Sequence, residues 1–488
     1  MRGFKPNSPQ ENHSWLDSGY TRPWRGGVRM LSAEAKRVLV TGSTGFIGQR
    51  LCLELARRGY RIIALVRDEK GAELPFPAEK ILWDSAENLA DIDAVVHLAG
   101  EPIADKKWSL EQKEKIVKSR TETARRLHSI IKAIKGRRPS VVVSASAVGY
   151  YGDRGDELLS VNSPPGTGFL AETCVAWEGA VEEMRASVPR IVRLRTGIVL
   201  GRGGGALEKI SSLFKFYLGG RLGSGRQWMS WIHLDDLVGL YVNALEDSNV
   251  NGPVNAVAPQ TVTNGEFTRT LAQQLKVAAL FPAPKFILKL VLGERSTLLL
   301  DSQRVKSPEF SFRYEKLADA LRQIFKDVES ARGLRAHDLV STVWWRGPPE
   351  ELFARQAANQ GVESMGPPEL KLKRISQSTT RLQEGSSYGF SGRVEGMPFR
   401  TESRVVDWVE NHRFTTTQVK GPFSFWVHSR KFERLGGGTL FTETVVYRPR
   451  FGFLGDLLCH RYLARKLETI FGFRRRALAG EGAAFAVK

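Results

Sequence analysis

The sequence predicts an α/β fold built on a doubly wound parallel sheet, followed by a second domain of the α+β class. From about residue 36 to 326, short β-branched runs alternate with stretches of helical periodicity, which is typical of a parallel sheet with helices on both faces. After about residue 335, a helix, several strands and one long helix follow in that order. We therefore expect two domains, at residues 36–326 and 335–480.

The expected strands of both domains are bounded by glycine-rich or polar segments. Those of the first domain are 37–41, 61–66, 81–83, 94–98, 140–144, 190–194, 230–233 and 253–257. Those of the second are 370–375, 393–399, 402–408, 413–420, 423–433 and 439–447, between helices at 350–360 and 457–474. We expect the second sheet to wrap around the last helix.

Composition limits the classes of function. With 488 residues, of which 42% are hydrophobic and 25% charged, the chain is typical of soluble globular proteins. Its three cysteines (Cys52, Cys174 and Cys459) are far apart and form no Cys-x-x-Cys pattern, so we expect neither disulfides nor a metal site. The formal net charge of +20 is spread along the chain, and we expect no specific nucleic-acid binding.

The N-terminal residues 1–35 hold no apolar segment typical of a secretory signal, and we expect them to be a disordered extension. No uninterrupted apolar run of about 18 residues occurs, so no transmembrane segment is expected. These features predict a cytoplasmic protein. They leave its oligomeric state open.

A glycine-rich loop follows the first predicted strand and reads Gly42-Ser43-Thr44-Gly45-Phe46-Ile47-Gly48. Because the loop leads into a helix, its backbone N–H groups and the helix N-terminus are suited to hold a pyrophosphate. Gly42 and Gly45 allow the ligand to approach closely, and Gly48 lets the helix pack near the sheet. The loop therefore predicts a Rossmann-like dinucleotide site.

The end of the second predicted strand bears on which dinucleotide binds. Sites that prefer NAD usually place a carboxylate there, whereas this chain has Arg67 followed by Asp68. A guanidinium matches a 2′-phosphate with two hydrogen bonds, so Arg67 favours NADP(H) over NAD(H). Asp68 favours NAD(H), and Arg67 as a plain surface charge is the alternative.

Several motifs resemble those of extended short-chain dehydrogenases/reductases and sugar-nucleotide epimerases. These motifs are His97-Leu98-Ala99-Gly100, Ser144-Ala145-Ser146 and Trp231-Ile232-His233-Leu234-Asp235-Asp236. Longer motifs at 146–152, 223–233 and 255–259 resemble the "epimerase family protein" subgroup, described in places as a cell-division inhibitor. The resemblance covers about residues 36–325.

This resemblance implies further cofactor contacts beyond the glycine loop. They are Asp84 at the adenine, Leu98, Ala99 and Gly100 along the cofactor, and Ser144 near the nicotinamide. Polar groups at these strand ends, such as Ser144 and Ser146, have an alternative interpretation as hydrogen-bonded structural residues.

Proteins of this fold normally carry a Tyr-x-x-x-Lys pair, in which the lysine lowers the pKa of the tyrosine. When Glu178 is aligned with the glutamate that often follows the pair, Leu170 stands at the tyrosine position and Cys174 at the lysine position. The usual acid/base pair is therefore absent. Either another group supplies the proton, or the protein binds NADP(H) without turnover.

The residues expected to replace the pair follow the fifth predicted strand. Tyr150 and Tyr151, with Ser146, are the candidate catalytic residues, although both rings could instead only line the pocket. Arg226, Gln227 and Trp228 lie in a glycine-rich loop suited to cover the site, and are the candidate substrate contacts.

The second domain is similar to the START-like, polyketide-cyclase type ligand-binding fold, on the motifs at 421–432, 436–439 and 443–447. Such helix-grip folds hold an apolar small molecule between a sheet and a long helix. Trp426, His428 and Phe432 fall on one face of a strand, where ordinary core packing is the alternative.

Together these features predict an NADP(H)-binding oxidoreductase or epimerase-like protein that acts on a small molecule, with a fused domain for an apolar ligand. The alternative is a catalytically inactive NADP(H)-binding protein with a regulatory or redox-sensing role, for example in cell division.

Overall fold

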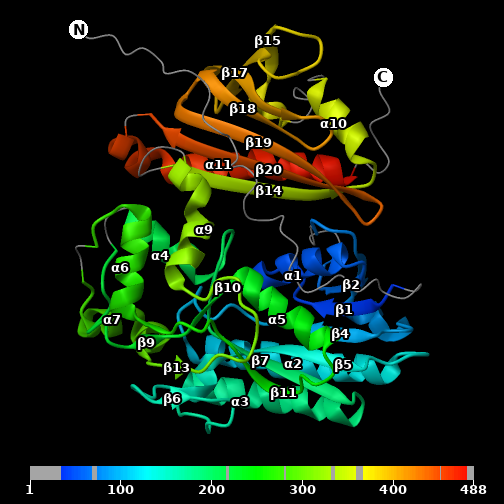
Figure 1. Ribbon diagram of the computed structural model, residues 1–488, viewed down its shortest axis with the longest axis vertical. Helices are drawn as coiled ribbons and strands as arrows, with labels where there is room; N and C mark the ends of the chain where they lie inside the picture. The colour runs from blue at the N-terminus through cyan, green and yellow to red at the C-terminus, as the bar shows by residue number, and fades with distance from the viewer. Residues whose placement is uncertain are drawn as a thin grey trace.

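The computed structural model describes residues 35–68, 74–215, 219–279, 282–330, 336–358, 366–450 and 452–480. The predicted disordered extension falls on residues 1–34, which lie outside the described residues. The chain forms two sheet-containing parts, and α9 (Leu317–Ser330) runs from the first toward the second (Figure 1).

The first sheet has seven strands in the order β11-β7-β5-β4-β1-β2-β3, and every neighbouring pair is parallel. The strands are β1 (Arg37–Thr41), β2 (Arg61–Val66), β3 (Glu79–Leu82), β4 (Ala94–His97), β5 (Val141–Ala147), β7 (Arg190–Thr196) and β11 (Gly252–Ala256). The prediction of a doubly wound parallel sheet is therefore confirmed.

Helices cover both faces of this sheet. They are α1 (Phe46–Arg57) and α5 (Leu234–Glu246) on one face, and α2 (Leu110–Ala133) and α3 (Phe169–Glu182) on the other. Successive residues of β1 divide between the two layers: Val38 and Val40 pack in the α1/α5 core, and Leu39 packs in the α2/α3 core. A strand buried on both faces explains why its sequence is a continuous β-branched run.

The strand predicted at 230–233 is not part of this sheet. It forms β10 (Trp231–His233), which pairs with β8 (Ile198–Leu200) in a separate two-stranded sheet. The chain bends at Gly197, where a Cβ atom would lie 2.6 Å from the carbonyl oxygen of Ser230. Only a glycine permits this close approach. After Gly197, β8 pairs with β10 and not with a strand of the main sheet.

The second sheet has seven antiparallel strands in the order β14-β20-β19-β18-β17-β16-β15. They are β14 (His337–Trp345), β15 (Lys373–Gln377), β16 (Ser387–Val394), β17 (Met397–Val409), β18 (Arg413–Lys420), β19 (Phe423–Leu435) and β20 (Gly438–Pro449). The long helix α11 (Gly452–Gly480) packs on β14 and β20, and α10 (Pro349–Ala357) packs on β19 and β20.

One expectation for this sheet is wrong, and one of its strands was missed. A strand at 393–399 is excluded, because the chain reverses at Glu395 and Gly396, whose φ angles are 48° and 83°. The alternating side chains on either side of this turn hid the reversal in the sequence. The first strand, β14, was not predicted, and its partner β20 lies about a hundred residues later in the chain.

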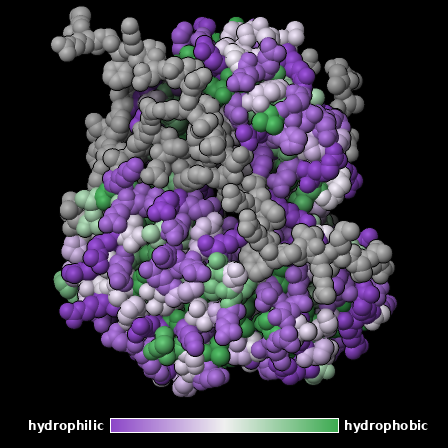
Figure 2. Space-filling view, in the orientation of Figure 1, coloured by the Kyte–Doolittle hydropathy of each residue, from purple (hydrophilic) through white to green (hydrophobic). Residues whose placement is uncertain are grey.

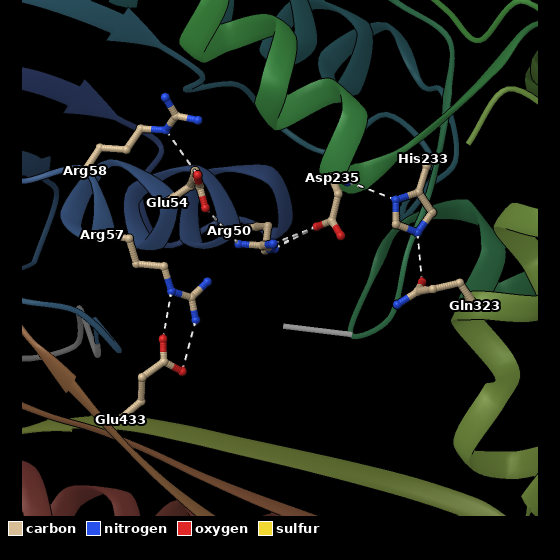
Figure 3. Close-up of polar contacts among 8 residues, drawn as sticks. All are labelled: Arg50, Glu54, Arg57, Arg58, His233, Asp235, Gln323 and Glu433. Atoms are coloured by element: carbon tan, nitrogen blue, oxygen red, sulfur yellow. Dashed lines mark hydrogen bonds and ion pairs between the residues drawn. The ribbon is translucent and has the colours of Figure 1, made fainter. Parts of the chain in front are cut away.

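The two parts of the chain touch each other through the β19–β20 hairpin. Leu435 and Leu440 join the hydrophobic core on the α1/α5 side of the first sheet. The Arg57 side chain on α1 donates two hydrogen bonds to Glu433 on β19, at 3.0 and 3.3 Å (Figure 3). The boundaries predicted for the two domains remain predictions.

On the coloured part of the face shown in Figure 2, hydrophilic residues predominate and hydrophobic residues are scattered among them. Within the ranges that the structure describes, no helix combines the length and the apolar character needed to cross a bilayer. Nor do three or more His, Cys, Asp or Glu side chains in these ranges gather as metal ligands would.

Candidate functional site

The glycine loop lies at the carboxyl end of β1, between β2 and β4, where the order of strands reverses. Gly42 has a φ angle of 71°, and a Cβ atom there would lie 2.8 Å from the carbonyl carbon of Leu98. A Cβ atom on Gly48 would lie 2.1 Å from the Gly42 carbonyl oxygen. Both positions therefore require glycine. The loop forms a tight turn at the point where the strand order reverses, which is where open α/β sheets bind ligands.

The N-terminus of α1 is open toward this loop. Its N-cap residue is Gly45, and no side chain caps the helix. Thr44 and Gly45 are exposed, while the Ser43 hydroxyl is buried without a hydrogen-bond partner among the described residues. The free N–H groups and the helix dipole make this end a site for an anion. The loop thus fits the pyrophosphate of a dinucleotide.

The end of β4 is held against this loop by Thr41. Its hydroxyl accepts hydrogen bonds from the backbone N–H groups of Leu98 and Ala99, both at 3.2 Å, and lies 2.8 Å from His97 Nδ1. Burial, with the nearby charge of Arg120, lowers the pKa of His97 to about 4. His97 is therefore neutral at pH 7 and holds the loop in place. Ser144 is fully buried in register with His97, on β5.

The outer end of the site is polar and accessible. Arg67 and Asp68 are both exposed directly after β2. Asp84 is exposed next to β3 and forms an ion pair with Arg126. Gly100 is exposed, and a Cβ atom on it would lie 3.3 Å from the guanidinium carbon of Arg120.

Arg120 is a residue that the sequence did not point to. Its guanidinium donates hydrogen bonds to the carbonyl of Glu101 at 3.2 Å, and lies 5.0 Å from the centre of the Trp177 ring. It stands in a charge-rich helix among surface arginines, so no sequence signal distinguished it. The structure brings its positive charge next to Gly100 and Glu101.

Two of the candidate catalytic residues belong to a buried hydrogen-bond network. The Ser146 hydroxyl donates to Glu178 at 2.7 Å, and the Tyr151 hydroxyl donates to Asn255 at 2.6 Å. Arg195 joins them, donating to both carboxylate oxygens of Glu178 at 2.8 and 2.9 Å and to the Tyr151 hydroxyl at 3.0 Å. Ser146 and Tyr151 are thus fixed as parts of the fold.

Tyr150 differs from its neighbour. It is half-buried, and its hydroxyl has no hydrogen-bond partner in the described part of the chain. The guanidinium carbon of Arg195 lies 3.5 Å from the centre of its ring, a cation–π contact that fixes the ring. Of the three candidate catalytic residues, Tyr150 alone keeps a free hydroxyl at the carboxyl edge of the sheet.

The helix α3 presents the two positions at which the Tyr-x-x-x-Lys pair is missing. A Cβ atom on Gly149 would lie 3.5 Å from Leu170 and 3.9 Å from the sulfur of Cys174. Burial raises the pKa of the Cys174 thiol to about 12, so it is protonated at neutral pH and unsuited to act as a nucleophile.

The candidate substrate contacts have three different environments. Gln227 is buried and donates to the carbonyls of Leu222 and Leu299, both at 3.1 Å, so its side chain shapes the loop. The Trp228 indole donates to Asp156 at 2.6 Å. Arg226 is exposed to solvent.

Asp301 is a second residue that the sequence did not point to. Its carboxyl is half-buried, and burial together with the charge of Asp153 raises its pKa to about 6. Asp153 lies two residues after Tyr151 and accepts hydrogen bonds from the backbone N–H groups of Ser302 and Gly155. Asp301 is therefore a titratable group close to the segment that carries Tyr150.

His233 and Asp235 have a structural role. The ring of His233 caps α5 by accepting from the Asp235 N–H at 3.1 Å and lies 3.0 Å from Gln323 on α9. Asp235 accepts from Arg50 on α1 at 2.8 Å (Figure 3). These contacts tie the cofactor helix α1 to α5 and α9.

The sheet order, the glycine turn and the open helix N-terminus define a dinucleotide-binding α/β protein. Residues 38–257 match the model of the NAD dependent epimerase/dehydratase family, and residues 283–324 match a domain of unknown function, DUF1731. With relatives that it matches over most of their length, the chain belongs to the epimerase family, which confirms the resemblance seen in the sequence.

Two relatives illustrate this membership. An epimerase family protein SDR39U1 homolog of Arabidopsis thaliana, named as chloroplastic, is 40% identical over 304 residues, which are 59% of this chain and 86% of the relative. The epimerase family protein Mb2239 of Mycobacterium bovis is 35% identical over 58% of this chain and 96% of its own.

Two solved structures are similar in fold. Human epimerase family protein SDR39U1 (isoform 2), crystallised with NADPH, has a TM-score of 0.54 and 34% identity over 59% of this chain and 98% of its own. A nucleoside-diphosphate sugar epimerase from Corynebacterium glutamicum has a TM-score of 0.50 and 34% identity over 60% of this chain and 59% of its own.

Proposed function

We propose that this chain binds NADP(H) in the Gly42–Gly48 turn and uses it on a small molecule, as an oxidoreductase or epimerase-like protein. The observation that carries the proposal is the turn itself, which demands glycine at two positions and faces an uncapped helix N-terminus. The human relative crystallised with NADPH supports the choice of ligand.

The preference for NADP(H) over NAD(H) rests on Arg67. Its side chain is exposed at the carboxyl end of β2, where the adenosine ribose lies in dinucleotide sites of this topology. A planar guanidinium there gives a 2′-phosphate a charge-assisted contact that NAD(H) cannot make. Asp84 and the lining of Leu98, Ala99, Gly100 and Ser144 are the further proposed cofactor contacts.

A bound nicotinamide would supply the hydride chemistry, and this chain would supply the proton. Tyr150 is the proposed proton donor, because its hydroxyl is free and its ring is fixed over Arg195. Ser146 and Tyr151 hold the segment that carries Tyr150 through their bonds to Glu178 and Asn255. Arg226 and Trp228 are the proposed substrate contacts.

A second function, a regulatory or redox-sensing protein that binds NADP(H) without turnover, is favoured by one observation. Leu170 and the protonated thiol of Cys174 occupy the positions where α3 would present tyrosine and lysine to the site. In this alternative, cofactor binding would be sensed by the second sheet, which α1 contacts through Arg57 and Glu433.

For the second domain, we propose a START-like fold that holds an apolar ligand. The support is a seven-stranded antiparallel sheet against which the long helix α11 packs at β14 and β20. Trp426 lies in the hydrophobic cluster between sheet and helix, together with Tyr447 and Phe471.

The cofactor proposal is tested by titrating NADPH and NADH into the wild-type chain and into Arg67→Ala. We expect the NADPH affinity to fall about tenfold or more, and the NADH affinity to change little, since one charge-assisted contact is lost. The matched control is Arg61→Ala, at the exposed start of the same strand. Equal losses for both nucleotides would contradict the phosphate contact.

Turnover is tested by following NADPH absorbance with a panel of carbonyl substrates. Tyr150→Phe should lower kcat by a factor of about 10² to 10⁴, as expected for loss of a general acid. NADPH that stays bound and is oxidised by no substrate would instead support the regulatory alternative.

A further inference from the structure

The inner face of the second sheet contains a cluster of buried ionisable groups. His428 and Arg430 come from β19, Glu443 comes from β20, and Arg474 comes from α11. Their exposed fractions are only 4%, 6%, 3% and 9%, in that order. The cluster therefore lies within the interior, although arginine and glutamate are mostly found on protein surfaces.

One carboxylate oxygen serves three of these side chains. Oε1 of Glu443 accepts from Nη1 of Arg474 at 3.0 Å and lies 3.0 Å from Nε2 of His428. Nε of Arg430 lies 3.8 Å from the same oxygen, which is an ion-pair distance but too long for a hydrogen bond. Arg430 is therefore the member of the cluster with the weakest contact.

The hydrogen-bond donors of Arg430 also show that its contacts within the cluster are incomplete. Its Nε and Nη1 atoms are buried and have no hydrogen-bond partner among the described residues. The guanidinium instead lies 5.0 Å from the centre of the Phe414 ring, which lies directly opposite on β18. A buried guanidinium with two unused donors is costly, because those donors give up their bonds to water.

The charge states of the cluster follow from its contacts. Burial, followed by the nearby charge of Arg430, lowers the pKa of His428 far below its usual value, so this ring is neutral at pH 7. Burial alone would raise the pKa of Glu443, but the charge of Arg474 and the hydrogen bond from His428 lower it below its usual value, so Glu443 is ionised. Arg430 and Arg474 thus share one ionised carboxylate.

The surroundings of Arg430 are largely aromatic. Phe414, whose ring lies against the Arg430 guanidinium, belongs to one hydrophobic cluster together with Phe432 and Phe441. Phe471, whose ring lies 5.6 Å from that of His428, belongs to another cluster together with Tyr447. The hydroxyl of Tyr388, on β16 of the same sheet, donates to Thr416 at 3.3 Å.

We propose that the second domain binds an apolar monocarboxylic acid, with its carboxylate at Arg430 beside Arg474. This inference rests on the proposed ligand-binding function of this domain and names the chemical class of its ligand. The carboxylate of such an acid would accept hydrogen bonds from the two unused donors of Arg430, whose own contact with Glu443 is 3.8 Å long. The neighbouring aromatic side chains suit the apolar body of such an acid.

The test compares dodecanoate with dodecan-1-ol, two probes with the same chain and different head groups, added to the full chain below their micelle concentrations. Binding is followed by tryptophan fluorescence, because Trp426 lies in the adjacent hydrophobic cluster. We expect the wild type to bind dodecanoate at least about tenfold more tightly than the alcohol, and Arg430→Met to lose this preference while it still binds the alcohol.

The matched control is Arg434→Met, since Arg434 lies on the same strand with an exposed side chain that pairs with Glu350. It should keep the preference for dodecanoate. Equal binding of both probes by the wild type would overturn the carboxylate site and leave the apolar-ligand function intact. A wild type that binds neither probe would overturn both.

A second measurement separates a binding role of Arg430 from a structural one. Without added ligand, Arg430→Met should raise the Tm of the chain or leave it unchanged, because it removes a buried charge that lacks a full partner. A marked fall in Tm would show that Arg430 is needed to build the interior, and would overturn the proposal.

Discussion

Each part of the molecule contains a buried cluster of arginine and glutamate, and the two clusters differ in how completely their donors are used. In the first, Arg195 uses its Nε and Nη2 for Glu178, and its Nη1 for the Tyr151 hydroxyl and the Val161 carbonyl. In the second, Arg430 keeps two buried nitrogens without a bond. The donors of Arg195 are thus all used within the chain, whereas two donors of Arg430 are not.

The difference also bears on which residues carry function. Ser146 and Tyr151 have the residue types of a catalytic pair, yet the first cluster uses their hydroxyls to hold β5, α3 and β7 together. Arg430 has the residue type of a surface charge, yet it lies in the interior. The type of a residue therefore suggests a role. Whether the residue can play that role depends on whether its hydrogen-bonding atoms are already used within the protein.

The largest effect is expected when the complete cluster is broken. Glu178→Gln removes the charge that Arg195 needs and should lower the free energy of unfolding by about 3–5 kcal/mol, because a buried guanidinium loses its partner. Urea unfolding followed by fluorescence measures this loss. Glu183→Gln is the control, since this carboxylate is 49% exposed and pairs with Arg125 at 3.5 Å. A loss no larger than the control's would contradict a stabilising role for the pairing of Glu178 with Arg195.

An intermediate effect concerns pH. The folded-state pKa of His428 is lowered by burial, so the unfolded chain binds more protons than the folded chain as the pH falls below 6.5. His428 therefore costs stability in acid, at up to about 1.4 kcal/mol per pH unit. Glu443, whose pKa is also lowered, adds a loss in the same direction below about pH 4.5.

The measurement is the free energy of unfolding of wild type and His428→Gln between pH 7 and 5, above the range of Glu443. The variant should show a flatter dependence on pH, because the group that is protonated on unfolding is gone. His412→Gln, at an exposed histidine between β17 and β18, should keep the slope of the wild type. Identical slopes in all three proteins would exclude a buried neutral His428.

The smallest effect concerns the contact between the two parts. Arg57 and Glu433 are 16% and 29% exposed, and partly exposed ion pairs contribute about 0.5–1 kcal/mol. A double-mutant cycle with Arg57→Ala and Glu433→Ala should give a coupling energy of this size. A coupling energy near zero would mean that the hairpin contact depends on apolar packing, such as that of Leu435 and Leu440, and not on this ion pair.

The sequence predicted much of the first fold, because local signals there agree with the tertiary structure. Strands buried on both faces give β-branched runs, and the turn at Gly42 and Gly48 demands a residue without a Cβ atom. In the second sheet, the same local signals failed at Glu395 and Gly396, where a turn interrupts an alternating pattern. Neither β14 nor its pairing with β20 has a local signature.

By itself, the sequence determined the class of the fold, the position of the dinucleotide loop and the absence of the Tyr-x-x-x-Lys pair at Leu170 and Cys174. These properties depend on residues that are neighbours in the chain. Only the tertiary structure decided that Tyr150 keeps a free hydroxyl while Tyr151 does not, and that Arg430 shares Glu443 with Arg474. These hydrogen bonds and ion pairs form between side chains that are distant in the chain and meet only in the folded protein. The order of residues therefore does not reveal which of their donors and acceptors are used.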